Sequence, residues 1–499
     1  MKQCLIIPMG GKGQRFINAG YKIYKPFLKI SENFRIIDKI VKNFNDKNIE
    51  IIIIGNLKRI QSAKLSFKNK VHLINIEDHK LGPLYSIFLA NQKLKKIIKD
   101  HSFFISYSDI NWNWNFSRVN EFISKKETVV FTHFGFHPHL EVDDRSDFCL
   151  ADQNENLIEI SQKKPISKDY KNDLLAIGCY YFKKYSLIGN FFQNYKNFLS
   201  VNKKEYYLVT LLKYLIRKEN KINFYNIDNF VHLGLPSQYE DFINWKKILI
   251  DKFKISLKLN QANVMLMAGK GKRVKKLNQK KPFLKIENFE MYDYIFKKYG
   301  TNRNFIITTK SYYRDIKKKY NIFKINQSNS MLQTIEKSAK LFKNKKNFFL
   351  SSCDCFGIFD KRQFNKFIKQ KNPDIILFAY KFSSLQNKLR NSHTILNIKN
   401  NKLISIKVKK NTKNSIYGHA GFFWIKNSNV FNFISGFKKT CKQKRELLVD
   451  DYFKYLFDNN KFKVKYFKLE NYLHIGSFVE YNELNYWINY FKNENRKIY

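Results

Sequence analysis

The amino-acid sequence predicts an α/β protein of two tandem domains, each a mixed, mostly parallel sheet flanked by helices. In each half, apolar runs of strand length alternate with segments of helical periodicity, the pattern of strands joined by helices in a parallel sheet. Motifs of the first half recur in the same order in the second, which indicates an internal duplication. Each half has about 240 residues, enough for a core of its own, so we expect domains at 1–250 and 260–499.

Local patterns predict the elements of the first half. Short apolar runs predict strands at 5–9, 49–55, 72–78 and 101–109, the first of them buried. Helical periodicity predicts a helix at 36–44 and a helical segment that begins at Gly82 and Pro83.

The later part of each half has a different pattern. It predicts antiparallel strands with turns, at 129–136 and 148–162 in the first half and at 374–382 and 393–408 in the second. The lysine- and asparagine-rich stretch 251–260 is the expected junction, and its composition predicts a short linker.

Two Gly-rich blocks carry the duplication. The first is IIPMGGKGQRF followed by YKPFLKI, and the second is VMLMAGKGKRV followed by KKPFLKI. Further matches keep their order to the end of each half: Asp109 with Asp354, Gly178 with Gly421, Glu205 with Glu446, and His232 with His474. Chance similarity is a poor explanation for several separate motifs in one order.

The first Gly-rich block is suited to binding phosphate. Gly10, Gly11 and Gly13 have no Cβ, so their backbone amides can approach a ligand at the start of a helix. Arg15 adds a guanidinium fork for phosphate oxygens, and Lys25 adds a second cation suited to a leaving pyrophosphate. The spacing fits neither a Walker loop nor a complete dinucleotide-binding fingerprint.

Asp109 follows a predicted strand, as the Gly-rich block does. Both segments should therefore lie at the carboxyl edge of the sheet, where ligands bind in such folds. A carboxylate there is a hard oxygen ligand suited to Mg²⁺, and Asp354 is its counterpart in the second half. A simple cap at the end of the strand is the alternative role for Asp109.

The stretches PMGGKGQRF and AGYKIYKPFLKI resemble the signature of sugar-phosphate nucleotidylyltransferases, especially those associated with bacterial capsule and surface polysaccharide genes. The resemblance covers the first half and implies a Rossmann-like fold, close to the glycosyltransferase-A topology, for each copy. It implies catalytic roles for Arg15, Lys25 and Asp109, with Mg²⁺ at Asp109. The implied nucleotide-binding residues are Gly10, Gly11, Gly13 and Gly82, with Gly269, Gly271, Arg273 and Lys281 in the second copy.

The stretches QKKPIS and AIGCYYF resemble the part of the family that binds the sugar phosphate. By this match Lys164 binds the phosphate, Gly178 lines the sugar pocket and Glu205 holds sugar hydroxyls. The implied reaction is attack of a sugar 1-phosphate oxygen on the α-phosphorus of an NTP, which releases pyrophosphate and gives an NDP-sugar.

The sequence departs from the family pattern at two positions of the first half. His232 stands where the family often has a second metal-binding Asp, and imidazole is a poor Mg²⁺ ligand. His232 therefore contacts phosphate, orients its loop, or is purely structural. Lys163 replaces an acidic residue beside Lys164.

The second copy is less well preserved. Ser330 replaces Gly82, and only Lys409 or Lys410 is available as a sugar-phosphate lysine. The copy is either a second active transferase or a degenerate packing or regulatory partner. Retained nucleotide binding is favoured, because the residues expected to face the triphosphate persist.

Other functions remain as alternatives. A cytidylyltransferase for an alcohol phosphate such as phosphocholine uses a similar fold and loop. A catalytically inactive tandem protein that binds nucleotide sugars is an alternative from another class. A glycosyltransferase is disfavoured, because FISYSD and SSCDC each offer a single Asp rather than an Asp-x-Asp motif.

Charge and cysteine content bear on partners and location. The formal net charge is +51, and the lysines are spread along the whole chain. Asn, Ile and Phe are over-used as well, as an AT-rich genome would produce. The charge is therefore better explained by biased composition than by an anionic macromolecular partner. The sequence has no nucleic-acid-binding motif and no apolar run of transmembrane length. We therefore expect it to bind neither nucleic acid nor a membrane. Six cysteines without a Cys-x-x-Cys pair indicate the reducing cytoplasm. Self-association stays open.

Overall fold

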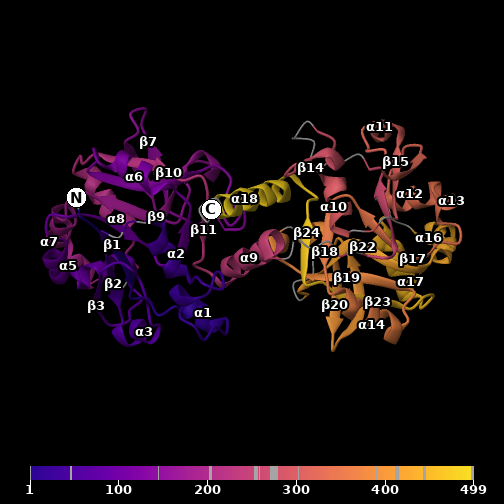
Figure 1. The fold of residues 1–499 in the computed structure, drawn as a ribbon, viewed down its shortest axis with the longest axis horizontal. Helices are drawn as coiled ribbons and strands as arrows, with labels where there is room; N and C mark the ends of the chain where they lie inside the picture. Colours follow the sequence, from indigo (N-terminus) through magenta and orange to yellow (C-terminus); the bar gives the residue numbers. More distant parts are fainter. Residues whose placement is uncertain are drawn as a thin grey trace. The chain divides into compact units, whose positions relative to one another are not determined.

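The computed structural model describes residues 2–44, 46, 48–143, 145–201, 205–251, 257, 259–269, 279–299, 301, 303–388, 390–410, 415–441 and 446–495. The chain forms two compact units, Met1–Ile243 with Lys492–Tyr499, and Asn244–Phe491 (Figure 1). The limits of the units fall inside helices α9 (Pro236–Lys246) and α18 (Phe478–Asn495). Much of the expected linker 251–260 lies outside the described residues, so a division there stays a prediction.

The main sheet of the first unit has the strand order β10-β6-β9-β4-β1-β2-β3, and β7 and β8 extend from β9. The strands are β1 (Gln3–Met9), β2 (Ile49–Gly55), β3 (Val71–Asn75), β4 (Ser102–Ser106), β6 (Thr128–Phe134), β7 (Phe148–Ala151), β8 (Leu157–Ser161), β9 (Leu174–Phe182) and β10 (Ile222–Asn226). Strands β10-β6 and β4-β1-β2-β3 are parallel, whereas β9 runs antiparallel between them. This mixed, mostly parallel sheet confirms the predicted fold class.

Helices cover both faces of this sheet. They are α2 (Ile36–Asn43), α3 (Leu57–Ser62), α4 (Pro83–Leu89), α5 (Asn91–Ile98), α6 (Phe116–Ile123), α7 (Ser186–Val201) and α8 (Leu208–Arg217). Phe103 of β4 packs in the core beneath α4, α5, α7 and α8, whereas the next residue, Phe104, contacts Phe44 after α2 on the opposite face. Because both faces are covered, strand β2, which lies between β1 and β3, carries a run of four buried isoleucines, Ile51–Ile54.

The helices follow local sequence signals with one difference. Helix α2 begins where Asp38 accepts a hydrogen bond from the backbone amide of Arg35 at 2.9 Å, which satisfies a donor at the helix start. The periodic segment after Gly82 forms two helices, α4 and α5, separated at Ala90. No helix in the described ranges combines the length and apolar character needed to cross a membrane.

The second unit repeats the topology of the first. Its sheet has the order β23-β19-β22-β17-β12-β15-β16, with β20 and β21 extending from β22. The strands are β12 (Ala262–Met267), β15 (Asn304–Thr309), β16 (Asn321–Ile325), β17 (Lys346–Ser352), β19 (Ile375–Lys381), β20 (Thr394–Lys399), β21 (Lys402–Val408), β22 (Tyr417–Asn427) and β23 (Val464–Lys468). The helices are α10 (Met291–Tyr299), α11 (Lys310–Tyr313), α12 (Met331–Lys337), α13 (Ala339–Phe342), α14 (Lys361–Lys371), α15 (Ser384–Lys388), α16 (Ile434–Thr440) and α17 (Val449–Asp458). Two units of one topology support the internal duplication.

A small two-stranded sheet accompanies each main sheet. In the first unit β5 (Ile110–Trp112) pairs with β11 (Phe230–His232), and in the second β18 (Cys355–Ile358) pairs with β24 (Asn471–His474). These antiparallel pairs bring a histidine from late in each unit beside the residue that follows the predicted metal-binding Asp. His232 lies opposite Ile110, and His474 lies opposite Cys355.

Candidate active site

The Gly-rich loop and Asp109 lie at the same edge of the first sheet. Strands β1 and β4 are parallel neighbours, with Ile6 opposite Ile105, and the two segments follow these strands directly. Gly13 begins helix α1 (Gln14–Asn18) with a φ of 70°, a left-handed value that favours glycine. This edge is where α/β sheets bind their ligands.

Lys25 and Asp109 form an ion pair across this edge. Lys25 Nζ lies 2.7 Å from Asp109 Oδ2, and the side chains are 20% and 27% exposed, so a ligand can reach both. Lys25 begins the short 3-10 helix η1 (Lys25–Phe27), where Pro26 fixes the backbone angle. Burial alone would raise the pKa of Asp109, but the charge and hydrogen bond of Lys25 lower it below its usual value. The site therefore pairs a carboxylate with a cation.

Gly10 and Gly11 have different surroundings. A Cβ on Gly10 would lie 2.6 Å from both His79 Nε2 and Ser86 Oγ, so the chain needs glycine at this point. A Cβ on Gly11 would meet nothing within 4 Å. The Tyr24 hydroxyl donates to the Gly11 carbonyl at 2.7 Å and fixes the loop. Gly11 is therefore the loop position with open space for a ligand.

Two further residues, Arg59 and Asp78, support the Gly-rich loop, although no sequence motif predicts a role for them. Arg59 forms an ion pair with Asp78 and lies over the Tyr24 ring, 4.3 Å from its centroid. A pocket of about 450 Å³ adjoins Arg59 and Tyr24. Its lining includes five cationic side chains: Lys12, Lys22, Lys25, Arg35 and Arg59. This lining is suited to an anionic ligand.

Gly82 connects the predicted nucleotide segment to the predicted sugar segment. It precedes α4 with φ 83° and ψ 169°, a region that only glycine occupies readily. A Cβ here would lie 2.4 Å from the backbone oxygen of Tyr206. The backbone amide of Tyr206 donates to the Leu81 carbonyl at 2.8 Å, which places neighbouring Glu205 beside this segment.

The residues predicted for the sugar are brought together only in part. Glu205 Oε2 accepts hydrogen bonds from Lys163 Nζ at 2.9 Å and from the Tyr207 hydroxyl at 2.6 Å. Burial opposes the shift, but these bonds and the charge of Arg15 lower the pKa of Glu205. The partner of Glu205 is Lys163, and Lys164, the predicted sugar-phosphate lysine, is exposed.

Gly178 has a separate structural reason to be glycine. It has a φ of 92°, and a Cβ would lie 2.7 Å from the Tyr107 ring. The Tyr107 hydroxyl in turn accepts a hydrogen bond from the Leu208 backbone amide at 3.2 Å. Tyr107 therefore links Gly178 to the chain that follows Glu205.

His232 is half-buried beside Asp109, and its neighbours include the buried histidines His137 and His139. The His137 ring centroid lies 5.5 Å from that of His232 and 5.4 Å from that of His139. Burial lowers the pKa of His232 to about 4, although the Asp109 charge acts in the opposite direction. A neutral imidazole next to Asp109 fits an orienting role. The motif HFGFHPH, which supplies the neighbouring histidines, is the sequence signal for this group.

We expect the first unit to lose stability as the pH falls from about 6.5 toward 4. Burial lowers the pKa of His139 to about 3, whereas a histidine in the unfolded chain titrates near 6.5. The unfolded chain therefore binds protons that the folded unit excludes, which costs about 2 kcal/mol per such histidine at pH 5 relative to pH 7. Urea unfolding of wild type and His139→Gln at both pH values measures this. An equal loss of stability in the two proteins would contradict it.

The second unit contains an equivalent ion pair. Lys281 and Asp354 are bonded directly, and their side chains are only 11% and 12% exposed. Burial alone would raise the pKa of Asp354, but Lys281 and His474 hold it well below its usual value. A Cβ on Gly269 would meet nothing within 4 Å, as at Gly11. Gly271 and Arg273 lie outside the described residues.

The residues of the first unit fit Mg²⁺ through a single carboxylate. Asp109 is the hard oxygen ligand, and Mg²⁺ is commonly held by one or two carboxylates with water and substrate phosphates. His232 Nε2 is buried without a hydrogen-bond partner among the described residues, but imidazole is a poor Mg²⁺ ligand. The donor set therefore fits a metal ion that arrives with a phosphate substrate.

Residues 5–241, which contain all of these groups of the first unit, match the nucleotidyl transferase family. Residues 5–241 form a nucleotidyl transferase domain. This domain is also the part in which the Gly-rich loop, Lys25 and Asp109 converge.

Similarity to individual proteins is distant. The bifunctional protein GlmU of Caldicellulosiruptor saccharolyticus is 24% identical over 253 residues, which cover 48% of this chain. The chain spans about half of that relative, 51% of its length.

Solved structures similar to part of the chain include two enzymes. A nucleoside-diphosphate-sugar pyrophosphorylase from Vibrio cholerae RC9 is 19% identical and matches 48% of this chain and 99% of its own, with a TM-score of 0.39. The inositol-1-phosphate CTP transferase from T. maritima is 17% identical and matches 47% and 98%, with a TM-score of 0.37.

Proposed function

We propose that the nucleotidyl transferase domain joins an NTP and a sugar 1-phosphate to give an NDP-sugar and pyrophosphate, for surface polysaccharide synthesis. The observation that carries the proposal is the Lys25–Asp109 pair at 2.7 Å beside the open Gly-rich loop. The reaction needs two anions held together and their charge neutralised, and this edge offers backbone amides, a cation and a metal-binding carboxylate.

The chain need not supply a covalent nucleophile for this reaction. A sugar-phosphate oxygen attacks the α-phosphorus in line, and pyrophosphate leaves from the opposite side. Amides near Gly11 and the charge of Arg15 bind the triphosphate, and Lys25 neutralises charge at the reacting phosphate. Mg²⁺ held by Asp109 would supply further charge neutralisation and orient phosphate oxygens.

Glu205 is the proposed ligand of the sugar hydroxyls. Its carboxylate is ionised, half exposed and held by Tyr207, so it can accept hydrogen bonds from a polyol. Lys163 bonds to Glu205 and Lys164 is exposed nearby, and either cation can meet the sugar phosphate. The capsule-type signature around Lys25 supports a sugar rather than an alcohol phosphate as the acceptor.

We further propose that the second unit retains nucleotide binding. Its Lys281–Asp354 pair and the open surroundings of Gly269 repeat the features of the first unit. Its nucleotide segment has changed, because Ser330 before α12 has an extended φ of −154° where Gly82 has a positive one.

Product identification tests the proposed substrate class. The full-length protein would be incubated with Mg²⁺, each of the four common NTPs, and a panel of sugar 1-phosphates and alcohol phosphates. Mass spectrometry is expected to detect an NDP-sugar with one NTP. A nucleotide–alcohol product instead would favour the cytidylyltransferase alternative. Nucleotide binding without any product would favour a catalytically inactive binding protein.

A further inference from the structure

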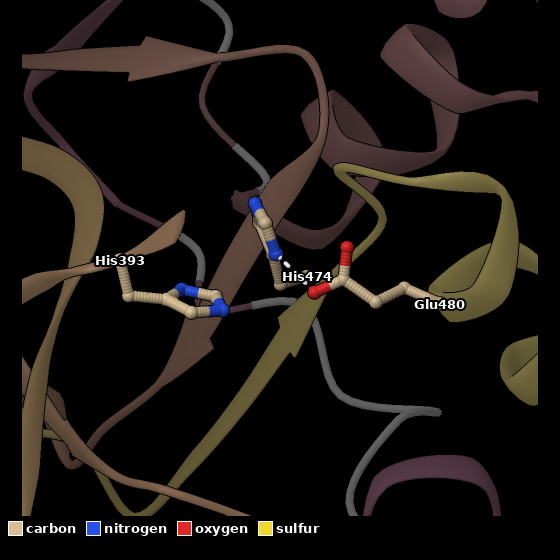
Figure 2. Close-up of side chains that lie close together, drawn as sticks. All are labelled: His393, His474 and Glu480. Carbon is tan, nitrogen blue, oxygen red and sulfur yellow. Dashed lines mark hydrogen bonds and ion pairs between the residues drawn. The ribbon is translucent and has the colours of Figure 1, made fainter. Parts of the chain in front are cut away.

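Three side chains of the second unit converge beside Asp354. His393 precedes strand β20, His474 ends strand β24, and Glu480 lies in the first turn of α18. Figure 2 shows one nitrogen of each imidazole and the carboxylate pointing toward one another. The three ligand atoms all lie within 4.8 Å of each other. In the described ranges, no other three histidine, cysteine or carboxylate side chains bring their ligand atoms so close.

These groups are enclosed and held in place by their neighbours. His393 is 6% exposed, and the Glu480 side chain is 4% exposed. The Tyr380 hydroxyl lies 2.9 Å from His393 Nδ1, and the other nitrogen of the ring is on the side that faces His474 and Glu480 (Figure 2). Ser477 Oγ donates to Glu480 Oε2 at 2.8 Å, while Oε1 lies 2.6 Å from His474 Nδ1. Such outer partners are typical of metal ligands, because they fix the ring tautomer and the carboxylate orientation.

We propose that His393, His474 and Glu480 bind a divalent transition metal ion, with Zn²⁺ as the expected occupant. Two imidazoles and one carboxylate are a zinc ligand set that leaves a fourth position for water or a substrate oxygen. Mg²⁺ is disfavoured, because it prefers oxygen ligands. Tetrahedral zinc would separate His474 Nδ1 and Glu480 Oε1 to about 3.3 Å, a small opening of the present contact.

The ligand set belongs to the second unit alone. In the first unit Gln238 occupies the sequence position that matches Glu480, and Asp147 precedes β7 as His393 precedes β20. Of the three ligands, only His474 has a matching residue in the first unit, which is His232. The site is also separate from the proposed transfer reaction, which is assigned to Lys25 and Asp109 of the first unit.

Metal binding to the full-length protein tests the proposal. After removal of metal with a chelator, Zn²⁺ would be titrated in competition with a chromophoric chelator, and one tight site per chain is expected. Co²⁺ should give the visible absorption of a four-coordinate ion. Loss of a residue that only hydrogen-bonds to a metal ligand typically weakens metal binding by roughly 10- to 100-fold. His474→Gln and Glu480→Gln each remove a ligand itself, so each should weaken zinc binding by more than this. Tyr380→Phe, which keeps the ring, should weaken it by about 10- to 100-fold.

His232→Gln is the matched control and should leave zinc affinity unchanged, because its unit lacks the other two ligands. Circular dichroism and unfolding temperature would verify that each variant is folded. Two results would overturn the proposal: no tight zinc site in the wild type, or unchanged zinc binding in folded Glu480→Gln and Tyr380→Phe. Either would mean that His474 and Glu480 form only a hydrogen-bonded pair.

Discussion

Lys25→Ala is expected to lower kcat/KM for nucleotidyl transfer by about 100- to 1,000-fold, the typical cost of removing one group that stabilises transition-state charge. Lys25 is the cation bonded to Asp109, and both face the edge where the phosphates would react. Its loss also removes the main influence that keeps the Asp109 pKa low, so burial would then raise that pKa. The variant should therefore lose further activity as the pH falls, through a range in which the wild type keeps its activity.

Steady-state kinetics over a pH series measures both effects. Lys22→Ala is the control, because Lys22 is a nearby exposed cation in the same pocket lining. It should change kcat/KM little and leave the pH profile in place. Equal losses in the two variants would mean that general positive charge, rather than the Lys25–Asp109 pair, supports the reaction.

Gly82→Ala is expected to destabilise the first unit by about 2–5 kcal/mol. Two costs add up here, because the backbone conformation is unsuited to alanine and the added Cβ makes a close contact. The added Cβ would lie 2.4 Å from the Tyr206 backbone oxygen, and the φ of 83° strains any side chain. Relief of the contact would move Tyr206 and with it Glu205. Chemical unfolding measures the stability, and KM for the sugar phosphate should rise as well.

Gly11→Ala is the control for this substitution. A Cβ at Gly11 would meet nothing within 4 Å, so its stability should stay close to that of the wild type. Gly11→Ala can still lower activity, because the loop is expected to face phosphate. Equal stability of the two variants would show that the Tyr206 backbone moves aside without cost.

Much of the fold was predictable because local patterns coincide with the tertiary arrangement. The isoleucine-rich segment 49–55 is a parallel strand between two others, and both of its faces are covered. The repeated Gly-rich block predicted a second unit, and the two sheets have the same strand order. Lys25 and Asp109 could be singled out because each belongs to a motif, and the structure places them 2.7 Å apart.

Other features depend on contacts that no local pattern encodes. Lys163 bonds to Glu205, which lies 42 residues further along the chain. His393 and His474 come together only when strands from distant segments pair, and neither lies in a metal-binding motif. Arg59 likewise belongs to no motif, because helix α3 between two strands brings it to the Gly-rich loop.

The most direct test of the central claim is pyrophosphate release with Mg²⁺ by wild type, Asp109→Ala and Asp354→Ala. The assay would use the NTP and sugar 1-phosphate that give a product. We predict that Asp109→Ala abolishes turnover and that Asp354→Ala retains it, because the first unit carries the proposed reaction. Turnover that survives Asp109→Ala, or that is lost only in Asp354→Ala, would contradict the assignment of the reaction to the first unit.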